Sequence, residues 1–268
     1  MLDLQTTLYE QMHAGKHKAD ELKTPFKFLI ATMLAGLYIG IADVYMMTAA
    51  GPFFVSDAPA TMLVAGLVFG IGLVLVVFAG ANLLTSAMMA LPHAAAGKMI
   101  SWQRAALALL LIFLGNLIGS VVFAYLMAHS GVFDDGTAAR EMLNYLVHSK
   151  TAKPTLALFI RGIFCNVLVC GGIWMAARTK NDCAKILILL LSIATFITAG
   201  FEHVVANMTT ISLGMFVGSP DAALGGFAWN LLWVGLGNLV GGMLIVGGSY
   251  YVYAGPAKAP DAGMSDTH

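Results

Sequence analysis

Long apolar runs separated by short polar segments dominate this chain. A helix needs about 20 apolar residues to cross a bilayer. Six runs of at least roughly that length can be read, at about 26–50, 61–91, 105–128, 154–177, 184–217 and 224–253. Because lipid offers the backbone no hydrogen bonds, spanning segments of this kind are helices. The pattern predicts an all-α membrane protein with six transmembrane helices.

The composition supports a membrane protein and limits the other classes. Hydrophobic residues make up 59% of the 268 residues, only 10% are charged, and the mean hydropathy is +0.83, far from the mix of a soluble domain. The formal net charge is zero, which argues against nucleic acid as a partner. Cys165, Cys170 and Cys183 form no CxxC pair, so neither a disulfide framework nor a zinc site is indicated. We expect no metal or cofactor.

The polar segment 1–24 lacks the apolar core and cleavage site of a signal peptide. It suits a short amphipathic helix lying on the membrane surface, with an apolar face formed by Leu4, Leu8, Met12 and Leu22. We expect a channel domain over 25–253 and a tail over 254–268.

Positive charges predict the orientation, because cytoplasmic loops are richer in Lys and Arg. With the N-terminus inside, ten of the 14 Lys and Arg residues fall on the cytoplasmic side and Arg161 lies within a span. Only Arg140, Lys150 and Lys153 fall outside. We therefore expect both termini in the cytoplasm.

Two strings recur along the chain at nearly one spacing. LGNLIG at 114–119 matches LGNLVG at 236–241, and AGANLLTSAM at 79–88 matches AGFEHVVANM at 199–208 at both ends, with offsets of 122 and 120. Three spans per half is an odd number, so the second half must enter the membrane from the opposite side. The sequence predicts an inverted 3+3 repeat.

Inverted repeats place a site near the bilayer midplane, between broken helices at matching positions. The matching segments 61–91 and 184–217 span roughly 31 and 34 residues, which is too long for one straight crossing. Both carry polar residues in the middle. We predict two broken helices, with loops near Asn82–Pro92 and Glu202–Asn207.

The polar residues at the second break have structural and functional interpretations. Glu202 and Asn207 can bond backbone groups freed by the break, and for Glu202 we favour this structural role. For His203 we favour a pore-lining role over that of a satisfied buried histidine, because an imidazole both donates and accepts and can take up a proton. Thr85, from the first break, is its natural partner.

Asp43 and Arg161 are ionisable residues within two other spans. At 1.5 Å rise per residue both lie about 10 Å from the outer face, so we predict that they pair. They form either a buried structural ion pair or, with Arg161 as a fixed positive charge, part of an outer vestibule that attracts anions.

The strings AGFEHVVANM, ANLLTSAM and FCNVLVC (164–170) resemble the formate/nitrite transporter family. The resemblance implies pentamers of aquaporin-like protomers, each with its own pore for small monovalent anions, in the bacterial cytoplasmic membrane. It implies that His203 is the central pore histidine, supported by Asn166 and Asn207 and faced by Thr85. It also implies pore constrictions at Phe69, Leu73, Leu83, Val169 and Phe196.

The chain departs from the family pattern at the first break. Family members usually carry Glu-Leu-Phe-Thr where this chain has Asn82, Leu83, Leu84 and Thr85, so an acid and an aromatic are both lost. Leu84 is expected to widen one constriction if it faces the pore. Many members carry Lys in place of Arg161, and we hypothesise that Arg161, lacking an acid at position 82, uses Asp43 as its counter-ion.

These observations predict a channel, not an enzyme, for small weak-acid anions such as formate, nitrite, hydrosulfide, lactate or bicarbonate. Arg161 concentrates the anion, with Lys150 or Lys153 as further candidates, and a proton arrives by or through His203. Net passage is either anion flow or anion with proton. A channel for water or ammonia is the alternative, against which counts the lack of twin Asn-Pro-Ala loops and of paired pore histidines. A serine enzyme built on Ser86 or Ser212 lacks an orienting third group.

Overall fold

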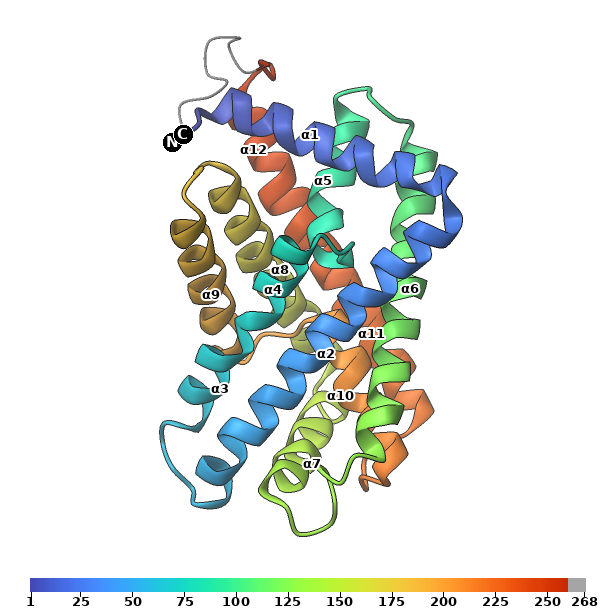
Figure 1. Cartoon of the computed structure of the whole chain (residues 1–268), viewed down its shortest axis with the longest axis vertical. Coiled ribbons are helices and arrows are strands. Elements are labelled where there is room, and N and C mark those ends of the chain that lie inside the picture. The colour runs from blue at the N-terminus through green and yellow to red at the C-terminus, as the bar shows by residue number, and fades with distance from the viewer. Residues whose placement is uncertain (260–268) are drawn as a thin grey trace.

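The computed structural model describes residues 1–259 and contains only helices and their connections there. Figure 1 shows a helical bundle with α1 lying across the end at which α12 is found. The first half comprises α1 (Leu4–Asp20), the short turn η1 (Glu21–Lys23), α2 (Pro25–Val55), α3 (Thr61–Phe69), α4 (Ile71–Ala79), α5 (Leu84–Ala96) and α6 (Trp102–Ala128). The second comprises α7 (Ala138–Thr151), α8 (Thr155–Ala177), α9 (Asp182–Thr198), α10 (Val204–Val217), α11 (Leu224–Leu239), the π-helical η2 (Val240–Gly248) and α12 (Ser249–Ala254).

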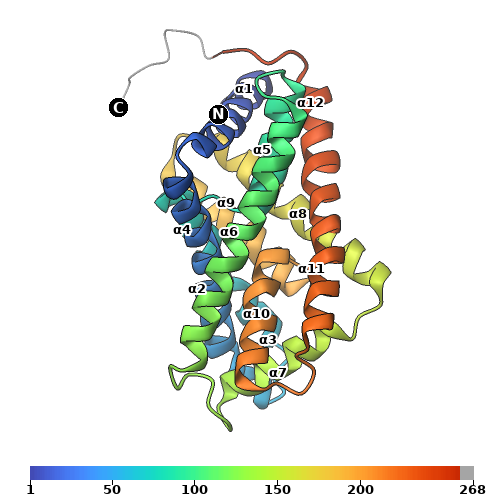
Figure 2. The ribbon, with the colours of Figure 1, turned by 90° about the vertical axis from the view of Figure 1, so that its right-hand side faces the viewer.

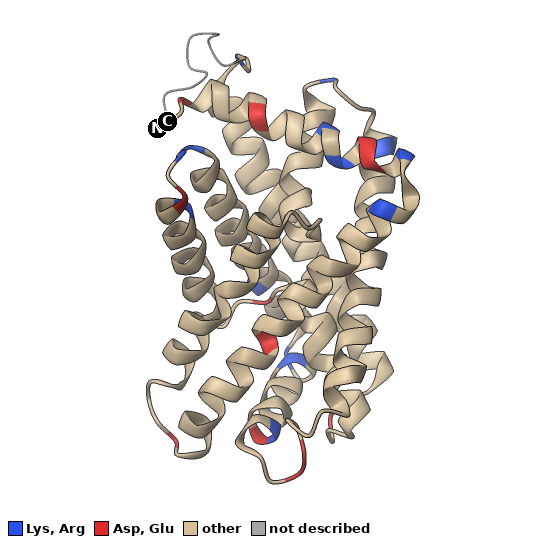
Figure 3. Ribbon diagram, in the orientation of Figure 1, with Lys and Arg blue, Asp and Glu red and all other residues tan. Residues whose placement is uncertain are grey.

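The six predicted crossings are present. Among the described residues, five helical stretches are long and apolar enough to span a membrane: Pro25–Val55, Thr61–Ala79, Trp102–Ala128, Thr155–Ala177 and Leu224–Ala254. The remaining crossing is divided between α9 and the short apolar α10. Charged residues concentrate toward the two ends of the bundle and are sparse in its middle (Figure 3). The chain is an integral membrane protein.

Both predicted helix breaks exist, but they are shorter than expected and come earlier. The chain leaves helix over 80–83 and again over 199–203. Gly80 and Gly200 occupy matching places with φ of 78° and 71°, a left-handed backbone that glycine adopts without steric cost. Pro92 lies inside α5 and Asn207 inside α10, so the predicted loop boundaries at these residues are wrong.

The helices restart early because buried side chains supply the bonds that a new helix needs. In the first half, Asn116 of α6 accepts from the Leu84 N–H at 2.9 Å. Its amide also donates to the carbonyls of Thr32 (2.8 Å) and Asn82 (2.9 Å). One side chain therefore ties α2, the first break and α5 to α6.

Asn238 makes the equivalent hydrogen bonds in the second half. It accepts from the Val204 N–H at 2.9 Å and donates to the carbonyls of Gly162 (2.8 Å) and Glu202 (2.9 Å). Asn116 and Asn238 belong to the two LGNL strings. Figure 2 shows the half-helices α5 and α10 at different heights, with α5 nearer the α1 end, as an inverted repeat requires.

The N-terminal helix does not lie on lipid as expected. Leu8 and Met12 are buried and belong to one hydrophobic cluster with Met89 of α5, Trp174 of α8 and Val246 of η2. Three elements leave apolar side chains at this end of the bundle, and the narrow apolar face of α1 covers them. The membrane-surface placement is therefore wrong.

The loop between α6 and α8 contains a helix that the hydropathy pattern did not predict. The helix α7 buries Met142, Leu143, Leu146 and Val147, a spacing typical of an amphipathic helix. It ends close to Lys150, Thr151 and Lys153. Its position matters because it brings two lysines to the second helix break.

Candidate functional site

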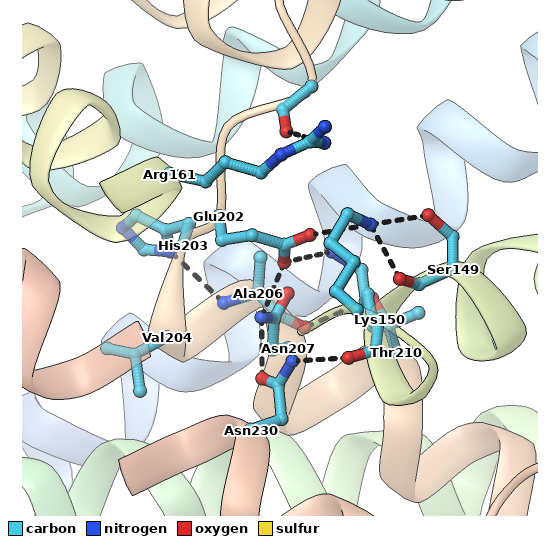
Figure 4. Close-up of polar contacts among 12 residues, drawn as sticks. Ser149, Lys150, Arg161, Glu202, His203, Val204, Ala206, Asn207, Thr210 and Asn230 are labelled. Carbon is cyan, nitrogen blue, oxygen red and sulfur yellow. Dashed lines mark hydrogen bonds and ion pairs between the residues drawn. The ribbon is translucent and has the colours of Figure 1, made fainter. Parts of the chain in front are cut away.

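A cavity of about 200 Å³ lies against the second helix break. The side chains that give it its charge are Asp43, Lys150, Lys153, Arg161 and Glu202, and His203 also lines it. We call it the Lys150 cavity. These side chains come from α2, α7, α8, the α7–α8 connection and the 199–203 segment, so residues far apart in sequence meet there (Figure 4).

Glu202 is a buried carboxylate with three donors. Lys150 Nζ lies 3.0 Å from one carboxylate oxygen and Lys153 Nζ 3.2 Å from the other. The Asn207 amide donates to Glu202 at 2.8 Å. A buried charge is tolerated only when it is paired and hydrogen-bonded, so Glu202 serves to hold two lysines beside the break.

Lys153 is held by more than Glu202. Its ammonium donates to the Ser149 carbonyl at 2.6 Å and to the Ser149 hydroxyl at 2.5 Å. Burial lowers the pKa of Lys153, while the nearby Glu202 carboxylate acts in the opposite direction. Lys153 therefore loses its charge at a lower pH than an exposed lysine does.

The predicted pair of Asp43 and Arg161 is wrong. Arg161 donates through Nη1 to the Gly200 carbonyl at 2.9 Å, whereas Asp43 accepts from the Thr210 hydroxyl at 3.0 Å. Gly200 lies in the break just after α9 (Asp182–Thr198), where a carbonyl has no helical partner and the helix end carries a partial negative charge. Asp43 therefore has no role as the counter-ion of Arg161.

His203 and Thr85 bring the two breaks together. His203 Nε2 lies 2.9 Å from the Thr85 hydroxyl oxygen, and its Nδ1 accepts from the Ala206 N–H at 3.1 Å. Because Nδ1 accepts a hydrogen bond, it carries no hydrogen in the neutral ring. The ring hydrogen is therefore on Nε2, which donates it to the Thr85 oxygen. The Phe196 ring is stacked on the imidazole at a centroid distance of 5.8 Å.

Neither of the expected supporting asparagines forms a side-chain hydrogen bond with the imidazole. Asn166 donates to the Thr85 carbonyl at 3.2 Å and to the Asn238 carbonyl at 2.7 Å. Asn207 connects Glu202 with Asn230, which it reaches at 2.8 Å. Asn166 therefore fixes the Thr85 backbone, and Asn207 fixes the carboxylate beside His203.

Most of the expected constriction residues lie in the protein interior. Phe69 and Phe196 meet edge to face at 6.0 Å between ring centroids. Leu73, Leu83 and Val169 are fully buried. Leu84 differs, because it lines an apolar groove between α6 and α11 together with Phe113 and Leu231. Consecutive helical residues point about 100° apart, so with Thr85 directed at His203, Leu84 faces this groove and its expected place in a pore constriction is wrong.

A second cavity of about 350 Å³ lies at the first break, on the side of α1. Lys18 donates to the Asn82 side-chain oxygen at 2.6 Å, and Asn82 donates to Glu21. All three residues line this Lys18 cavity. Burial lowers the pKa of Lys18, against the opposing effect of the Glu21 carboxylate.

The two cavities are equivalent in the repeat. Asn82 and Glu202 stand at matching positions, and a lysine from a non-spanning helix reaches each. The sequence reasoning missed Lys18 and Glu21, and it missed Asn116 and Asn238 although the repeated LGNL strings contain the two asparagines. No local pattern marks Lys18, which reaches Asn82 from 64 positions away.

A helical membrane protein built as an inverted repeat, with a buried histidine between two polar cavities, has the architecture of a channel or transporter. A family model described as formate/nitrite transporter matches residues 5–252. The chain belongs to this family of transporters and channels.

Its relatives agree with that assignment. The nitrite transporter NirC of Salmonella typhimurium is 38% identical over 237 residues, which cover 87% of this chain and 84% of the relative. A solved FNT family ion channel superimposes with a TM-score of 0.87 at 35% identity, covering 93% of this chain and 99% of that one. A pentameric formate channel with formate bound superimposes with a TM-score of 0.77 at 32% identity, covering 86% and 98%.

Proposed function

We propose that the protein is a channel for small monovalent anions of weak acids, foremost formate and nitrite, in which His203 permits proton-coupled passage. The observation that carries the proposal is the contact of 2.9 Å between His203 and Thr85. It joins the two helix breaks, with a lysine-containing cavity on either side.

The charges of the Lys150 cavity suit an anion at the entrance. Lys150, Lys153 and Arg161 carry three positive charges, of which the Glu202 carboxylate offsets one. A cavity with low-dielectric walls and one prevailing sign of charge concentrates ions of the opposite sign. Small anions are therefore drawn to the second break.

The hydrogen bonds of the Thr85–His203 pair suit an anion at the centre. Because Nε2 donates to the Thr85 oxygen, the Thr85 hydroxyl keeps its own hydrogen for an anion. An ion between buried apolar rings costs several kcal/mol, and a proton that joins the anion removes that cost. His203 is the titratable group at this place.

We infer a homopentamer in the bacterial cytoplasmic membrane, with both termini in the cytoplasm. The structural relative that is a pentamer supports the assembly. The helices α1 and α12 lie at one end. Lys18 is in α1 and Arg104 bonds Asp20 at the end of that helix, so the distribution of positive charge supports the orientation. The Lys150 cavity then opens outward and the Lys18 cavity inward. Hydrosulfide and bicarbonate are close analogues that the same pore accepts.

The test is uptake of formate and nitrite into liposomes that contain the purified protein, with an uncharged solute of similar size measured in parallel. Uptake of either anion well above that of protein-free liposomes supports the proposal. Passage of the uncharged solute with neither anion contradicts it and favours a channel for water or ammonia.

A further inference from the structure

Asp43 is a buried carboxyl group that the proposed passage does not yet use. It lies in α2, is only 1% exposed, and lines the Lys150 cavity. The structure places no ion pair on it among the described residues. An acid of this kind beside an anion entrance needs an explanation, because its negative charge opposes the ions that the cavity attracts.

The surroundings of Asp43 accommodate both of its protonation states. The Thr210 hydroxyl lies 3.0 Å from Asp43 Oδ2 and 3.2 Å from the Ala206 carbonyl oxygen. When Asp43 is ionised, the single hydroxyl hydrogen of Thr210 is donated to it. When Asp43 is protonated, its own hydrogen is donated to Thr210, which then donates to Ala206. The hydrogen bond between Asp43 and Thr210 is therefore kept in both states, and its loss on burial would be costly.

The contrast with Glu202 is direct. Glu202 receives bonds from two ammonium groups and one amide, which all favour the carboxylate. Asp43 has one neutral hydroxyl partner that can donate or accept. The two acids of the cavity are therefore built differently, one as a fixed charge and one as an exchangeable proton site.

Other charged and titratable groups near Asp43 come from three directions. The helix α7 contributes Tyr145 and Lys150, with Lys153 just beyond its end, α8 contributes Arg161, and the second break contributes Glu202 and His203. The packed helices α3, α4 and α10 contain no titratable side chain, and the groups of α6 are Arg104 and Tyr125, near its ends. Three cations therefore face one fixed carboxylate and Asp43.

We propose that Asp43 is a proton-operated selectivity element of the Lys150 cavity. When it is protonated, the cavity carries an excess of two positive charges and admits monovalent anions. When it is ionised, the excess falls to one and anion entry slows. This inference rests on the proposed function and adds a residue that sets how external pH governs entry, separately from proton coupling at His203.

The experiment is nitrite uptake by liposomes containing the full-length protein, with external pH varied, internal pH fixed and membrane potential clamped. For the wild type we expect uptake to rise as the external solution is made more acidic. Asp43→Asn removes the charge at constant shape, so its uptake at mildly alkaline pH should exceed that of the wild type, by roughly tenfold. Asp57→Asn is the matched control, because Asp57 is exposed in the α2–α3 connection and does not line the cavity.

Thr210→Val is the second variant, in case Asp43→Asn does not assemble. It leaves the carboxyl group but removes the hydroxyl, whose hydrogen bond to the ionised form is stronger than its bond to the protonated form. The midpoint of the pH profile should therefore move upward by about one pH unit. An Asp43→Asn profile that superimposes on the wild type overturns the proposal, as does an unchanged midpoint in Thr210→Val. A wild type that transports no anion overturns the proposed function itself and this inference with it.

Discussion

Asn116 and Asn238 make the same three hydrogen bonds at the two helix breaks of the repeat. Each accepts from the first N–H of a half-helix and donates to one carbonyl of the break and one carbonyl of a neighbouring spanning helix. The N–H and carbonyl groups that the two breaks leave outside helical bonding are thereby paired inside the protein. The breaks, and so the site between them, depend on these two side chains.

Asn238→Ala should destabilise the protein strongly, because it removes the partner of two buried backbone groups of the break, the Val204 N–H and the Glu202 carbonyl. An unsatisfied buried group costs roughly 1–3 kcal/mol, so a loss of at least about 2 kcal/mol is expected. The measurement is thermal unfolding in detergent. Asn181→Ala is the control, since Asn181 caps α9 near the surface and donates nothing to a break. Equal effects of the two substitutions would contradict the assigned role.

The backbones of α8 and α11 approach closely at Gly237, so a larger side chain there should destabilise the protein. A methyl group added at Gly237 would come within 2.2 Å of the Phe159 carbonyl oxygen, whereas one added at Gly225 meets nothing within 4 Å. Gly237→Ala should therefore cost about 1–3 kcal/mol or more through overpacking, and Gly225→Ala should be nearly neutral. The yield and thermal stability of the detergent-solubilised protein distinguish them, and a stable Gly237→Ala protein would argue against this packing.

Thr85→Val tests the contact between the two halves. Valine keeps the shape but removes the hydroxyl that accepts from His203 and donates to the anion, so folding should be retained. We expect formate uptake to fall by at least roughly tenfold, the loss associated with a hydrogen bond to a charged group. Ser86→Ala is the neighbouring control, because its hydroxyl donates only to the Leu83 carbonyl in the structure. Uptake by Thr85→Val at the wild-type rate would show that the Thr85 hydroxyl has no role in anion passage.

The lowered pKa of Lys153 leads us to expect that anion uptake falls at alkaline external pH. A cation whose pKa is lowered in the folded protein loses its charge earlier as the pH rises, and burial lowers the pKa of Lys153. The effect is best seen in the Asp43→Asn background, where the acid-side dependence is removed. Lys153→Arg keeps the charge throughout, so the alkaline fall should disappear. A fall of the same size with arginine would assign it to another group.

The sequence predicted the crossings and their inversion because both depend on local properties. Run length and hydropathy define a span, and two repeated strings with nearly equal offsets define the two halves. The sequence also pairs His203 with Thr85, because matching breaks in an inverted repeat meet. The structure places them in contact at 2.9 Å.

What could not be predicted depends on side-chain direction and on long-range contacts. Depth alone suggested that Asp43 and Arg161 pair, yet depth does not say which way each side chain points around its helix. The docking of α1 on the bundle depends on apolar surface assembled from α5, α8 and η2, which exists only after folding. Hydropathy likewise did not distinguish lipid from protein as the cover for Leu8.

Proton coupling at His203 is tested by the ratio of protons to anions carried by the wild type and by His203→Asn, from simultaneous measurement of formate uptake and internal pH. Asparagine retains the cap that His203 provides to α10, but it cannot take up a proton. We expect the wild type to carry protons with formate and His203→Asn to lose this coupling. An unchanged ratio in a well-assembled His203→Asn protein would contradict it.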